Sequence, residues 1–310
     1  MRVVITGGTG LIGRALTDSL AADNHEVIVL SRNARYVKGL PQSARAEPWD
    51  ARTAAGWGRL ADGADAIVNL AGASIGGENT FAILFGRWTN RNKKRILESR
   101  LNAGRAVMQA IEAARQKPKA LIQASAVGYY GVLNEGPVTE DSPHGNDFQA
   151  RVPWDWEAST SQAEVLGVRR VVIRSGLVMS GKAGILSMVT LPFKFFAGGR
   201  LGSGKQWFPW IHLADEVGAI RFLIDQPDAR GAFNLAAPGA ITNGQLARLL
   251  GRVMRKPSFF PVPAFALRLL LGEKATLVLD GAQIVPKRLL EAGYAFKFPD
   301  AELAFRDLLT

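Results

Sequence analysis

Short apolar runs alternate with longer amphipathic stretches over the first 175 residues of the chain. Mainly apolar runs occupy residues 3–5, 27–30, 66–72, 120–125 and 170–174, as expected for strands buried on both faces of a parallel sheet. A helical pattern that includes Leu16 and Leu20 comes after the first run, and two further helical patterns span residues 88–114 and 154–166. A short further strand is expected near residues 45–48. This alternation predicts an α/β fold built on a doubly wound parallel sheet.

The alternation loosens after Ser175. We expect long loops at residues 198–205 and 206–212, a short helix capped by Asp215, a strand at 233–236, a helix capped by Thr242 or Asn243, and a helical tail from residue 261. The pattern predicts a nucleotide-binding domain over residues 1–175, with part of its sheet completed by later strands. A smaller C-terminal α/β substrate region is expected over residues 176–310.

A glycine-rich turn joins the first strand to the first helix. Residues 7–13, GGTGLIG, contain the spacing G-x-G-x-x-G, in which one glycine makes the turn, one admits a pyrophosphate and one lets the helix pack on the strand. The helix that begins near Leu11 directs free N–H groups toward an anion. An ordinary turn is the alternative, but the context favours a Rossmann-type dinucleotide site at Gly7, Thr9, Gly10, Leu11, Ile12 and Gly13.

The end of the second strand indicates which dinucleotide would bind. An NAD site usually has Asp or Glu there to hold the ribose 2′-hydroxyl, whereas this chain has Ser31 and Arg32. An arginine suits a 2′-phosphate, so we expect NADP(H), with a solvated surface charge as the alternative for Arg32. Asp50, after the third strand, is a candidate adenine contact. Leu70, Ala71 and Gly72 are candidates to line the cofactor path, ahead of a glycine-rich loop at 74–80.

Composition limits the remaining chemistry. The 310 residues are 47% hydrophobic, contain no cysteine and only three histidines, which disfavours disulfides and a metal site. The formal charge of +11 is spread along the chain, so a nucleic-acid partner is not favoured. Apolar stretches at 185–197 and 262–271 are interrupted and too short to span a bilayer. We expect a cytoplasmic protein with no signal peptide, no membrane partner and an unknown small-molecule substrate. The sequence is compatible with a homodimer.

Several motifs together resemble the extended short-chain dehydrogenase/reductase superfamily. They are GGTGLIG (7–13), NLAG (69–72), SAVGYYG (125–131) and WIHLADEVGAI (210–220). Residues 86–100, 155–157, 202–212, 233–243 and 262–273 are similar to a narrower branch, the nucleoside-diphosphate-sugar epimerases also described as SulA-like cell-division inhibitors, which carry a C-terminal domain of unknown function. The resemblance implies a Rossmann fold, NADP(H) binding and an undefined substrate.

The chain departs from the superfamily where the proton chemistry would lie. The resemblance implies a Tyr-x-x-x-Lys pair, but its two places fall near Gln149 and Pro153, and neither residue can act as an acid or base. Ser125 and Tyr130, in the motif after the fifth strand, are the candidate catalytic residues in their stead. For each the alternative is structural: Ser125 could cap the strand, and Tyr130 could pack against the turn.

Other polar residues have two interpretations each. Glu157 is either a base or a helix-face charge, and Arg174 either pairs internally or reaches the cofactor. Lys93 and Arg87 either bind an anionic substrate or are solvated, while Lys205 and His212 lie on late loops that could close over a substrate. We therefore expect an epimerase-like oxidoreductase, with a non-catalytic NADP(H) sensor that engages a protein partner, possibly in cell division, as the alternative.

Overall fold

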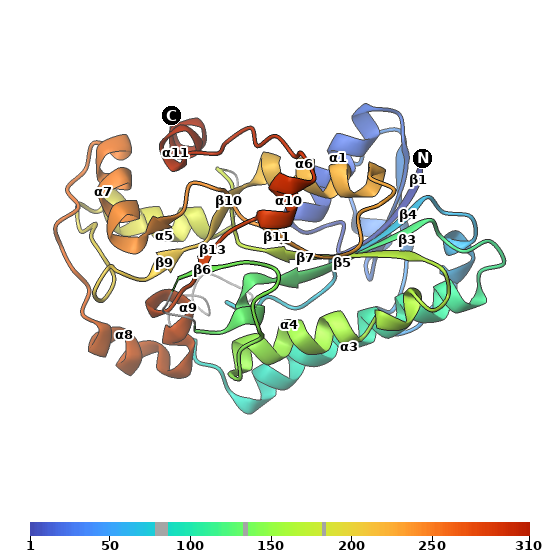
Figure 1. The fold of residues 1–310 in the computed structure, drawn as a ribbon, viewed down its shortest axis with the longest axis horizontal. Coiled ribbons are helices and arrows are strands. Elements are labelled where there is room, and N and C mark those ends of the chain that lie inside the picture. Colours follow the sequence, from blue (N-terminus) through green and yellow to red (C-terminus); the bar gives the residue numbers. More distant parts are fainter. Residues whose placement is uncertain (78–85, 133–135, 182–183) are drawn as a thin grey trace.

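A seven-stranded parallel sheet forms the centre of the molecule (Figure 1). The computed structural model describes residues 1–77, 86–132, 136–181 and 184–310, so residues 78–80 of the expected glycine-rich loop lie outside it. The strand order is β11-β7-β5-β4-β1-β2-β3, the order of a doubly wound Rossmann sheet. Its strands are β1 (Arg2–Thr6), β2 (Glu26–Ser31), β3 (Ala44–Pro48), β4 (Ala66–Asn69), β5 (Ala120–Ala126), β7 (Arg169–Ser175) and β11 (Gly231–Leu235).

The apolar runs form these strands because both of their faces are covered. Val3, Val4 and Ile5 of β1 are all fully buried, and the register pairs Val3 with Val27 of β2 and with Ala66 of β4. Side chains from the two faces then enter different hydrophobic clusters. The predicted fold class is confirmed, and each expected strand is present with its ends shifted by at most a few residues.

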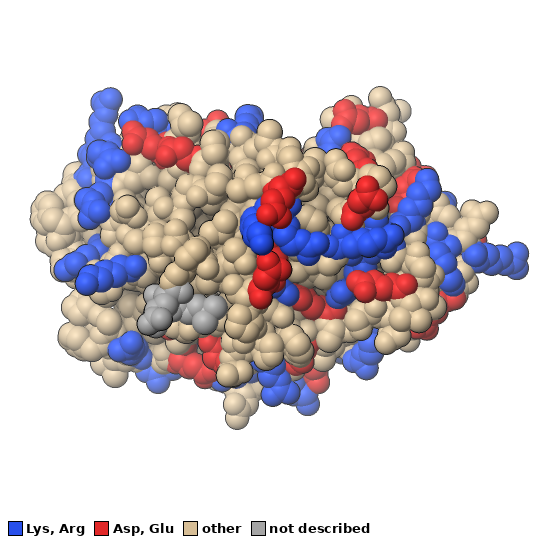
Figure 2. Space-filling model, in the orientation of Figure 1, with Lys and Arg blue, Asp and Glu red and all other residues tan. Residues whose placement is uncertain are grey.

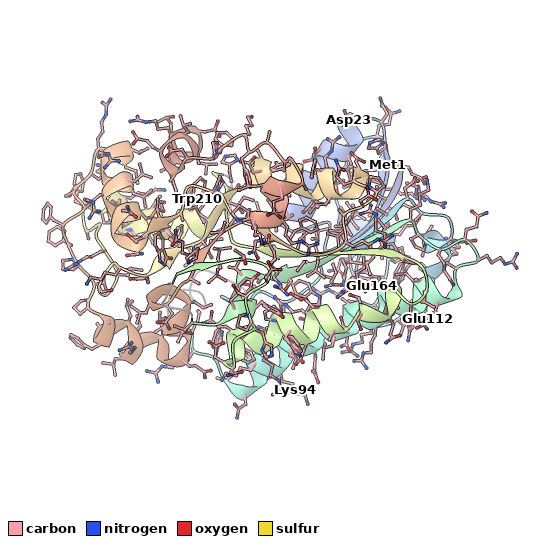
Figure 3. The ribbon with its side chains drawn as sticks, in the orientation of Figure 1. Met1, Asp23, Lys94, Glu112, Glu164 and Trp210 are labelled. Carbon is pink, nitrogen blue, oxygen red and sulfur yellow. The ribbon has the colours of Figure 1, made fainter. Side chains whose placement is uncertain are left out.

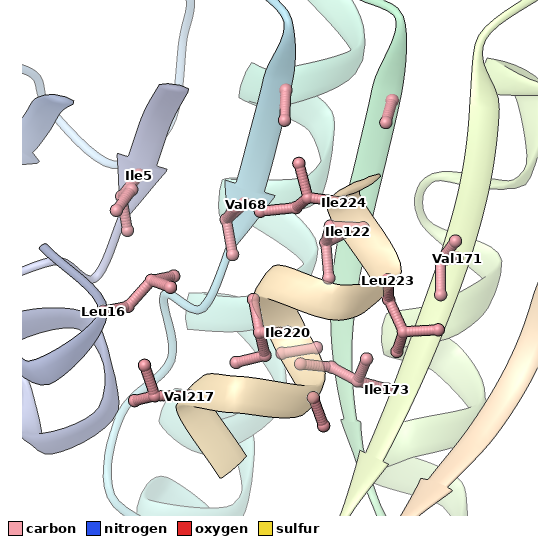
Figure 4. Packing of buried hydrophobic residues seen from close by; sticks show 14 of the residues in the cluster. Ile5, Leu16, Val68, Ile122, Val171, Ile173, Val217, Ile220, Leu223 and Ile224 are labelled. Atoms are coloured by element: carbon pink, nitrogen blue, oxygen red, sulfur yellow. The ribbon is translucent and has the colours of Figure 1, made fainter. Parts of the chain in front are cut away.

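Helices cover both faces of the sheet (Figure 1). One face carries α1 (Leu11–Ala22), α6 (Leu213–Asp225) and the short α10 (Lys287–Glu291), and the other carries α3 (Asn90–Ala113) and α4 (Phe148–Ala158). In the close view of Figure 4, Val217, Ile220 and Leu223 of α6 lie over the strands, with Val217 and Ile220 on the side of Leu16 of α1. Helix α6 therefore belongs to the nucleotide-binding sheet although it comes after residue 175.

The expected helix at 154–166 is wrong in both of its ends. Helix α4 begins at Phe148, where the carboxylate of Asp147 accepts a hydrogen bond from the N–H of Ala150 at 2.8 Å. It ends at Ala158, and a separate 3-10 turn, η4, follows at Ser161–Ala163. Pro153 lies inside the helix. Proline is normally excluded from helix interiors, but the N-terminal cap and the packing of α4 on α3 outweigh that preference here.

The start of α6 also differs from the expectation. The cap is the side chain of His212, whose Nδ1 accepts from the N–H of Ala214 at 3.0 Å, and Asp215 is instead a fully buried residue of the first turn. The stretch expected to be loop before it contains two short strands, β9 (Trp207–Phe208) and β10 (Trp210–His212). Asp215 fits the capping pattern by residue type alone, whereas its carboxylate accepts hydrogen bonds from the backbone of Lys297 and Phe298.

The remaining elements form a smaller region beside the sheet. It has its own cluster of buried residues, which includes Trp210, labelled in Figure 3, and Phe305. Helix α7 begins at a capping box formed by Thr242 and Gln245. Of the two expected caps, Thr242 and Asn243, the structure has Thr242. Of the described residues, no helix is long and apolar enough to cross a membrane. The elements are β6 (Pro137–Val138), β8 (Leu177–Met179), α5 (Ile185–Lys194), β12 (Ile241–Thr242), α7 (Asn243–Met254), α8 (Ala264–Leu271), η5 (Gly272–Ala275), α9 (Thr276–Leu279), β13 (Gln283–Ile284) and α11 (Ala301–Leu309).

Candidate cofactor site

A cleft of about 1540 Å³ lies at the carboxyl ends of β1, β2, β3 and β4. Strand order reverses between β1 and β4, which is where doubly wound sheets bind their ligands. Nine predicted cofactor residues line the cleft: Gly7, Thr9, Gly10, Ser31, Arg32, Asp50, Leu70, Ala71 and Gly72. The other three, Leu11, Ile12 and Gly13, lie in the first turn of α1 behind the glycine turn.

The glycine turn has a shape that larger residues would obstruct. Gly7 has a φ of +69°, and a Cβ there would lie 2.9 Å from the backbone of Leu70. A Cβ on Gly13 would lie 2.4 Å from the carbonyl oxygen of Gly7. Gly7 thus lets the loop after β1 contact the loop after β4, and Gly13 lets α1 pack directly on the glycine turn.

The N-terminus of α1 faces the cleft without a side-chain cap. Gly10 is the N-cap residue, it lines the cleft, and it makes no side-chain cap hydrogen bond. The first helical bond runs from the N–H of Arg14 to the carbonyl of Gly10 at 2.9 Å. An uncapped helix N-terminus in a cleft favours a phosphate group, so the residues present fit a dinucleotide pyrophosphate.

A buried polar chain supports the floor of this site. The hydroxyl of Thr6 donates to Asn69 Oδ1 at 2.6 Å and accepts from the N–H of Ala71 at 3.2 Å. Asn69 Nδ2 in turn donates to Gln123 Oε1 at 2.9 Å. These three side chains are fully buried and connect the ends of β1 and β4 to the middle of β5. Sequence reasoning missed them, although a polar residue directly after one apolar run and inside two others was the available signal.

The cleft is strongly cationic. Its lining includes seven basic residues, Arg14, Arg32, Lys38, Arg52, Arg91, Lys94 and Arg95, and only two carboxylates, Asp50 and Glu98. Lys94 lies in the first half of α3, far from Glu112 near the other end of that helix (Figure 3). Such a lining attracts a multiply charged anion, because the low-dielectric walls of a cleft concentrate its field.

Arg32 differs from the other cations in its position, directly after the end of β2. It is exposed, it lines the cleft, and within the described part of the chain its side chain has no hydrogen bond or ion pair. Arg14, by comparison, donates to the carbonyl oxygen of Lys38. The guanidinium of Arg32 is therefore available to a ligand, which the interpretation as an NADP(H) contact requires.

Asp50 is held in place after β3, the strand that pairs with β2. Its carboxylate accepts from the N–H groups of Arg52 and Thr53, each at 2.7 Å, and from the Thr53 hydroxyl at 2.8 Å. The hydrogen bond from the backbone of Thr53, followed by that from Arg52, lowers the pKa of Asp50 below its ordinary value. An ionised acid that is fixed in this way can accept a hydrogen bond from a ligand amine or hydroxyl.

Ser125 lies at the end of β5 in a second polar cluster. Its hydroxyl donates to Glu157 Oε1 at 2.5 Å, and the same carboxylate is clasped by Arg174 through Nε at 2.9 Å and Nη2 at 3.0 Å. Burial alone would lower the pKa of Arg174, but the hydrogen bonds and charge of Glu157 outweigh it and raise that pKa. Arg174 thus pairs internally, which was one of its two interpretations, and Glu157 is a partly buried ion-pair partner rather than a helix-face charge.

Tyr130 is fully buried next to this cluster. Its hydroxyl donates to Asn234 Oδ1 at 2.7 Å and accepts from Arg174 Nη1 at 3.0 Å. Burial, only partly offset by Arg174, raises the pKa of Tyr130 to about 12. In this arrangement the ring packs in the interior, as its structural interpretation expects, and the geometry favours Ser125 over Tyr130 for contact with a substrate.

The places of the superfamily's Tyr-x-x-x-Lys pair carry no acid or base. Gln149 donates through Nε2 to the Thr276 hydroxyl at 2.6 Å, and Pro153 is buried within α4. Lys93 pairs with Glu273 at 2.5 Å. Arg87 donates to the carbonyl of Leu270 at 3.2 Å. Three of these residues, Gln149, Lys93 and Arg87, thus bind the C-terminal segment.

The late loops contribute structure more than an open binding surface. His212 is buried beneath the ring of Phe298, and burial lowers its pKa despite the nearby carboxylates. Trp210 is buried and donates through Nε1 to the carbonyl of Gly239 at 3.0 Å. Lys205 remains exposed. The structural interpretation of His212 therefore holds in this conformation.

Comparison with known proteins assigns the class. Residues 3–236 match the NAD dependent epimerase/dehydratase family, and residues 262–308 match a domain of unknown function, DUF1731. The chain therefore belongs to the NAD dependent epimerase/dehydratase family, which confirms the resemblance expected from its motifs. The further likeness to cell-division inhibitors stays a prediction.

Individual relatives extend over the whole chain. Epimerase family protein YfhF of Bacillus subtilis is 39% identical and aligns with 100% of this chain and 98% of its own length. A chloroplastic SDR39U1 homolog of Arabidopsis thaliana is 38% identical, with 100% and 87% covered. The crystal structure of human epimerase family protein SDR39U1 (isoform 2) with NADPH has a TM-score of 0.87 at 34% identity and covers 99% of both chains.

Proposed function

We propose that this protein is an NADP(H)-dependent, epimerase-like oxidoreductase that acts on a small carbonyl or sugar-derived substrate. The observation that carries the cofactor choice is Arg32, an exposed guanidinium directly after β2 that has no partner among residues 1–77, 86–132, 136–181 and 184–310. The human relative, whose crystal structure contains NADPH, supports the same choice.

Each part of the cleft has a role in this proposal. The glycine turn and the first turn of α1 hold the pyrophosphate, while Ser31 and Arg32 hold the 2′-phosphate. Asp50 contacts the adenine, and Leu70, Ala71 and Gly72 line the path of the cofactor toward β5. When bound, the nicotinamide group supplies or accepts a hydride, and the protein provides position and electrostatics.

Ser125 is the residue proposed to contact the substrate. Its oxygen retains acceptor capacity while its proton is directed to Glu157. A substrate hydroxyl could then transfer its proton to Ser125 Oγ while the serine proton moves to Glu157, which Arg174 holds in position. Ser125→Ala should lower kcat and leave NADPH affinity within about twofold, because the serine does not line the cofactor cleft.

The cofactor assignment is tested by charge reversal at Arg32. We expect Arg32→Glu to weaken NADPH binding at least about tenfold in calorimetry, since an ionic contact to phosphate becomes a repulsion, and to change NADH binding far less. Arg35→Glu is the matched control, because Arg35 is exposed close by but does not line the cleft. Equal losses in both variants, or an unchanged preference in Arg32→Glu, would contradict the assignment.

A second function is favoured by one observation, the occupation of the Tyr and Lys places by Gln149 and Pro153. A non-catalytic NADP(H) sensor with a protein partner needs the cleft but not the proton chemistry. A screen of carbonyl substrates that follows NADPH absorbance separates the two functions. Turnover that Ser125→Ala abolishes supports the enzyme, whereas tight NADPH binding with no turnover of any substrate supports the sensor.

A further inference from the structure

Half of the exposed large apolar side chains in the described residues lie in two short segments. They are Phe195 and Phe196 after α5, Phe259 and Phe260 after α7, and Phe265, Leu269 and Leu270 on α8. Phe195, Phe259, Phe265 and Leu269 are each more than 70% exposed. Single exposed apolar residues are ordinary, but a gathering of this size marks an interaction site.

The backbone makes these residues one surface. The N–H of Phe260 donates to the carbonyl of Gly198 at 3.1 Å, and the N–H of Val262 donates to the carbonyl of Arg200 at 2.9 Å. The rings of Phe259 and Phe260 are 4.5 Å apart, and the Lys256 ammonium lies 3.7 Å from the centre of the Phe196 ring. We refer to residues 194–202 and 255–270 as the basic aromatic surface.

The two segments that carry these apolar side chains contain charges of one sign. Residues 194–205 and 248–270 contain eight basic residues and no Asp or Glu: Lys194, Arg200, Lys205, Arg248, Arg252, Arg255, Lys256 and Arg268. Only Arg252 among them has an acidic partner in an ion pair within the described chain, Glu302 of α11 at 3.2 Å. Figure 2 shows basic side chains set among uncharged surface at the end formed by α5, α7 and α8.

We propose that the basic aromatic surface docks on an anionic phospholipid bilayer. Aromatic side chains enter the interfacial layer of a membrane, and flanking Lys and Arg residues pair with lipid phosphates. An anionic bilayer thus offers apolar contact to the aromatic side chains and phosphate groups to the basic ones. A second copy of the chain would bring cations against cations, and a nucleic acid would leave the aliphatic side chains of α8 without an apolar partner. The contact is peripheral and needs no spanning helix. It departs from the expectation of no membrane partner, which rested on apolar stretches too short to span a bilayer.

The surface is independent of the cofactor cleft. None of its residues lines that cleft, so the proposal does not rest on the proposed function. It extends the role of the segment matched as a domain of unknown function, because α8 lies within residues 262–308. The C-terminal segment would then position the enzyme at a membrane surface.

Vesicle co-sedimentation of the full chain tests this inference. We expect binding to vesicles of phosphatidylcholine with about 30% phosphatidylglycerol, binding at least about tenfold weaker to phosphatidylcholine alone, and release at high salt. Phe195→Ser/Phe259→Ser should weaken binding to the anionic vesicles at least about fivefold, and Lys194→Gln/Arg255→Asn should do the same. Val165→Ser/Leu303→Ser and Arg115→Gln/Arg230→Gln are matched controls at exposed positions elsewhere.

Folding is checked in each variant by thermal unfolding and NADPH binding, which should match those of the parent protein. Equal binding to neutral and anionic vesicles, or no effect of the paired Phe substitutions, would overturn the inference. Dimerisation in sedimentation that the Phe substitutions abolish, without vesicle binding, would assign the surface to a second copy. Binding to short duplex DNA that the Lys194 and Arg255 substitutions abolish, again without vesicle binding, would assign it to a nucleic acid.

Discussion

Gly13 illustrates how single residues define this cofactor site. Helix α1 lies so close to the glycine turn at this position that a Cβ added to Gly13 would be 2.6 Å from the Cα of Gly8. The glycine spacing, read with the strand before it and the helix after it, was therefore informative at the level of individual atoms. Arg32 follows the second strand as expected, and its contact with a cofactor phosphate stays a prediction.

Gly13→Ala should be destabilising and should weaken cofactor binding. The new methyl group would contact the Gly7 carbonyl at 2.4 Å, and overpacking of this kind costs about 1–3 kcal/mol. Urea unfolding and NADPH calorimetry measure the two effects. Gly167→Ala is the control, because Gly167 has open space around it and its φ of +80° alone costs about 1–2 kcal/mol. Equal NADPH affinity in both variants would contradict this role for Gly13.

The two buried polar clusters could not be predicted residue by residue. Thr6 and Asn69 are 63 positions apart, and Ser125 and Glu157 are 32 apart. Such pairs depend on how β1, β4 and α4 align in space, which hydrophobic periodicity does not report. A polar residue within or directly after an apolar run indicates that a hydrogen-bond partner is present but does not identify that partner.

At the scale of elements, the sequence predicted which helices and strands exist better than where they begin. The strands were recovered because continuous apolar runs can only be buried on both faces. The start of α4 was missed because Pro153 argued against a helix that in fact begins at Phe148. The cap of α6 was misplaced because Asp215 has the preferred chemistry, while the histidine that caps the helix is a less common choice.

Helix α6 also carries an unusual acid, Glu216, which faces the end of β7. It is fully buried, and its only described partner is the Ser175 hydroxyl, which donates to Oε1 at 2.5 Å. Burial raises the pKa of Glu216 to about 8, although the Ser175 hydrogen bond lowers it in part. The folded protein therefore holds a proton that the unfolded chain releases above a pKa of about 4.3.

Stability should consequently fall as the pH rises from about 4.5 to about 8 and should then level off, because the unfolded state binds fewer protons across that window. Glu216→Gln keeps the shape of the neutral acid and should flatten this dependence. Between pH 5.5 and 8, the parent should lose about 3 kcal/mol relative to the variant in urea unfolding. Parallel pH profiles for the two proteins would show that Glu216 is ionised in the folded state.

At the scale of the whole molecule, the C-terminal segment is an integral part of the fold. Strand β13 pairs with β6, Asn234 Nδ2 donates to the carbonyl of Val285 at 3.1 Å, and Phe305 is fully buried. Sequence patterns indicated a helical tail but not its contacts, because short elements of two to nine residues carry little periodic signal. The overall sheet was predictable, whereas the packing of this segment on it was not.

Asp215 connects that segment to the sheet. Its buried carboxylate accepts from the N–H of Lys297 at 2.7 Å and from the N–H of Phe298 at 2.8 Å. Asp215→Ala should lower the free energy of unfolding by roughly 3 kcal/mol, because two backbone donors lose their acceptor. Asp225→Ala, at the exposed end of the same helix, should change it by less than about 0.5 kcal/mol. Similar unfolding midpoints for the two variants would contradict this account.

The long sequence separation between Asp215 and its two backbone donors has a consequence for biosynthesis. Helix α6 covers the central sheet, yet the backbone groups that donate to its buried carboxylate lie 82 and 83 positions later. Until Lys297 and Phe298 have left the ribosome, that carboxylate lacks these donors and stays hydrated, which keeps the first turn of α6 from packing fully. Helix α6 therefore completes its packing only late in synthesis, and its first turn stays open to a chaperone until then.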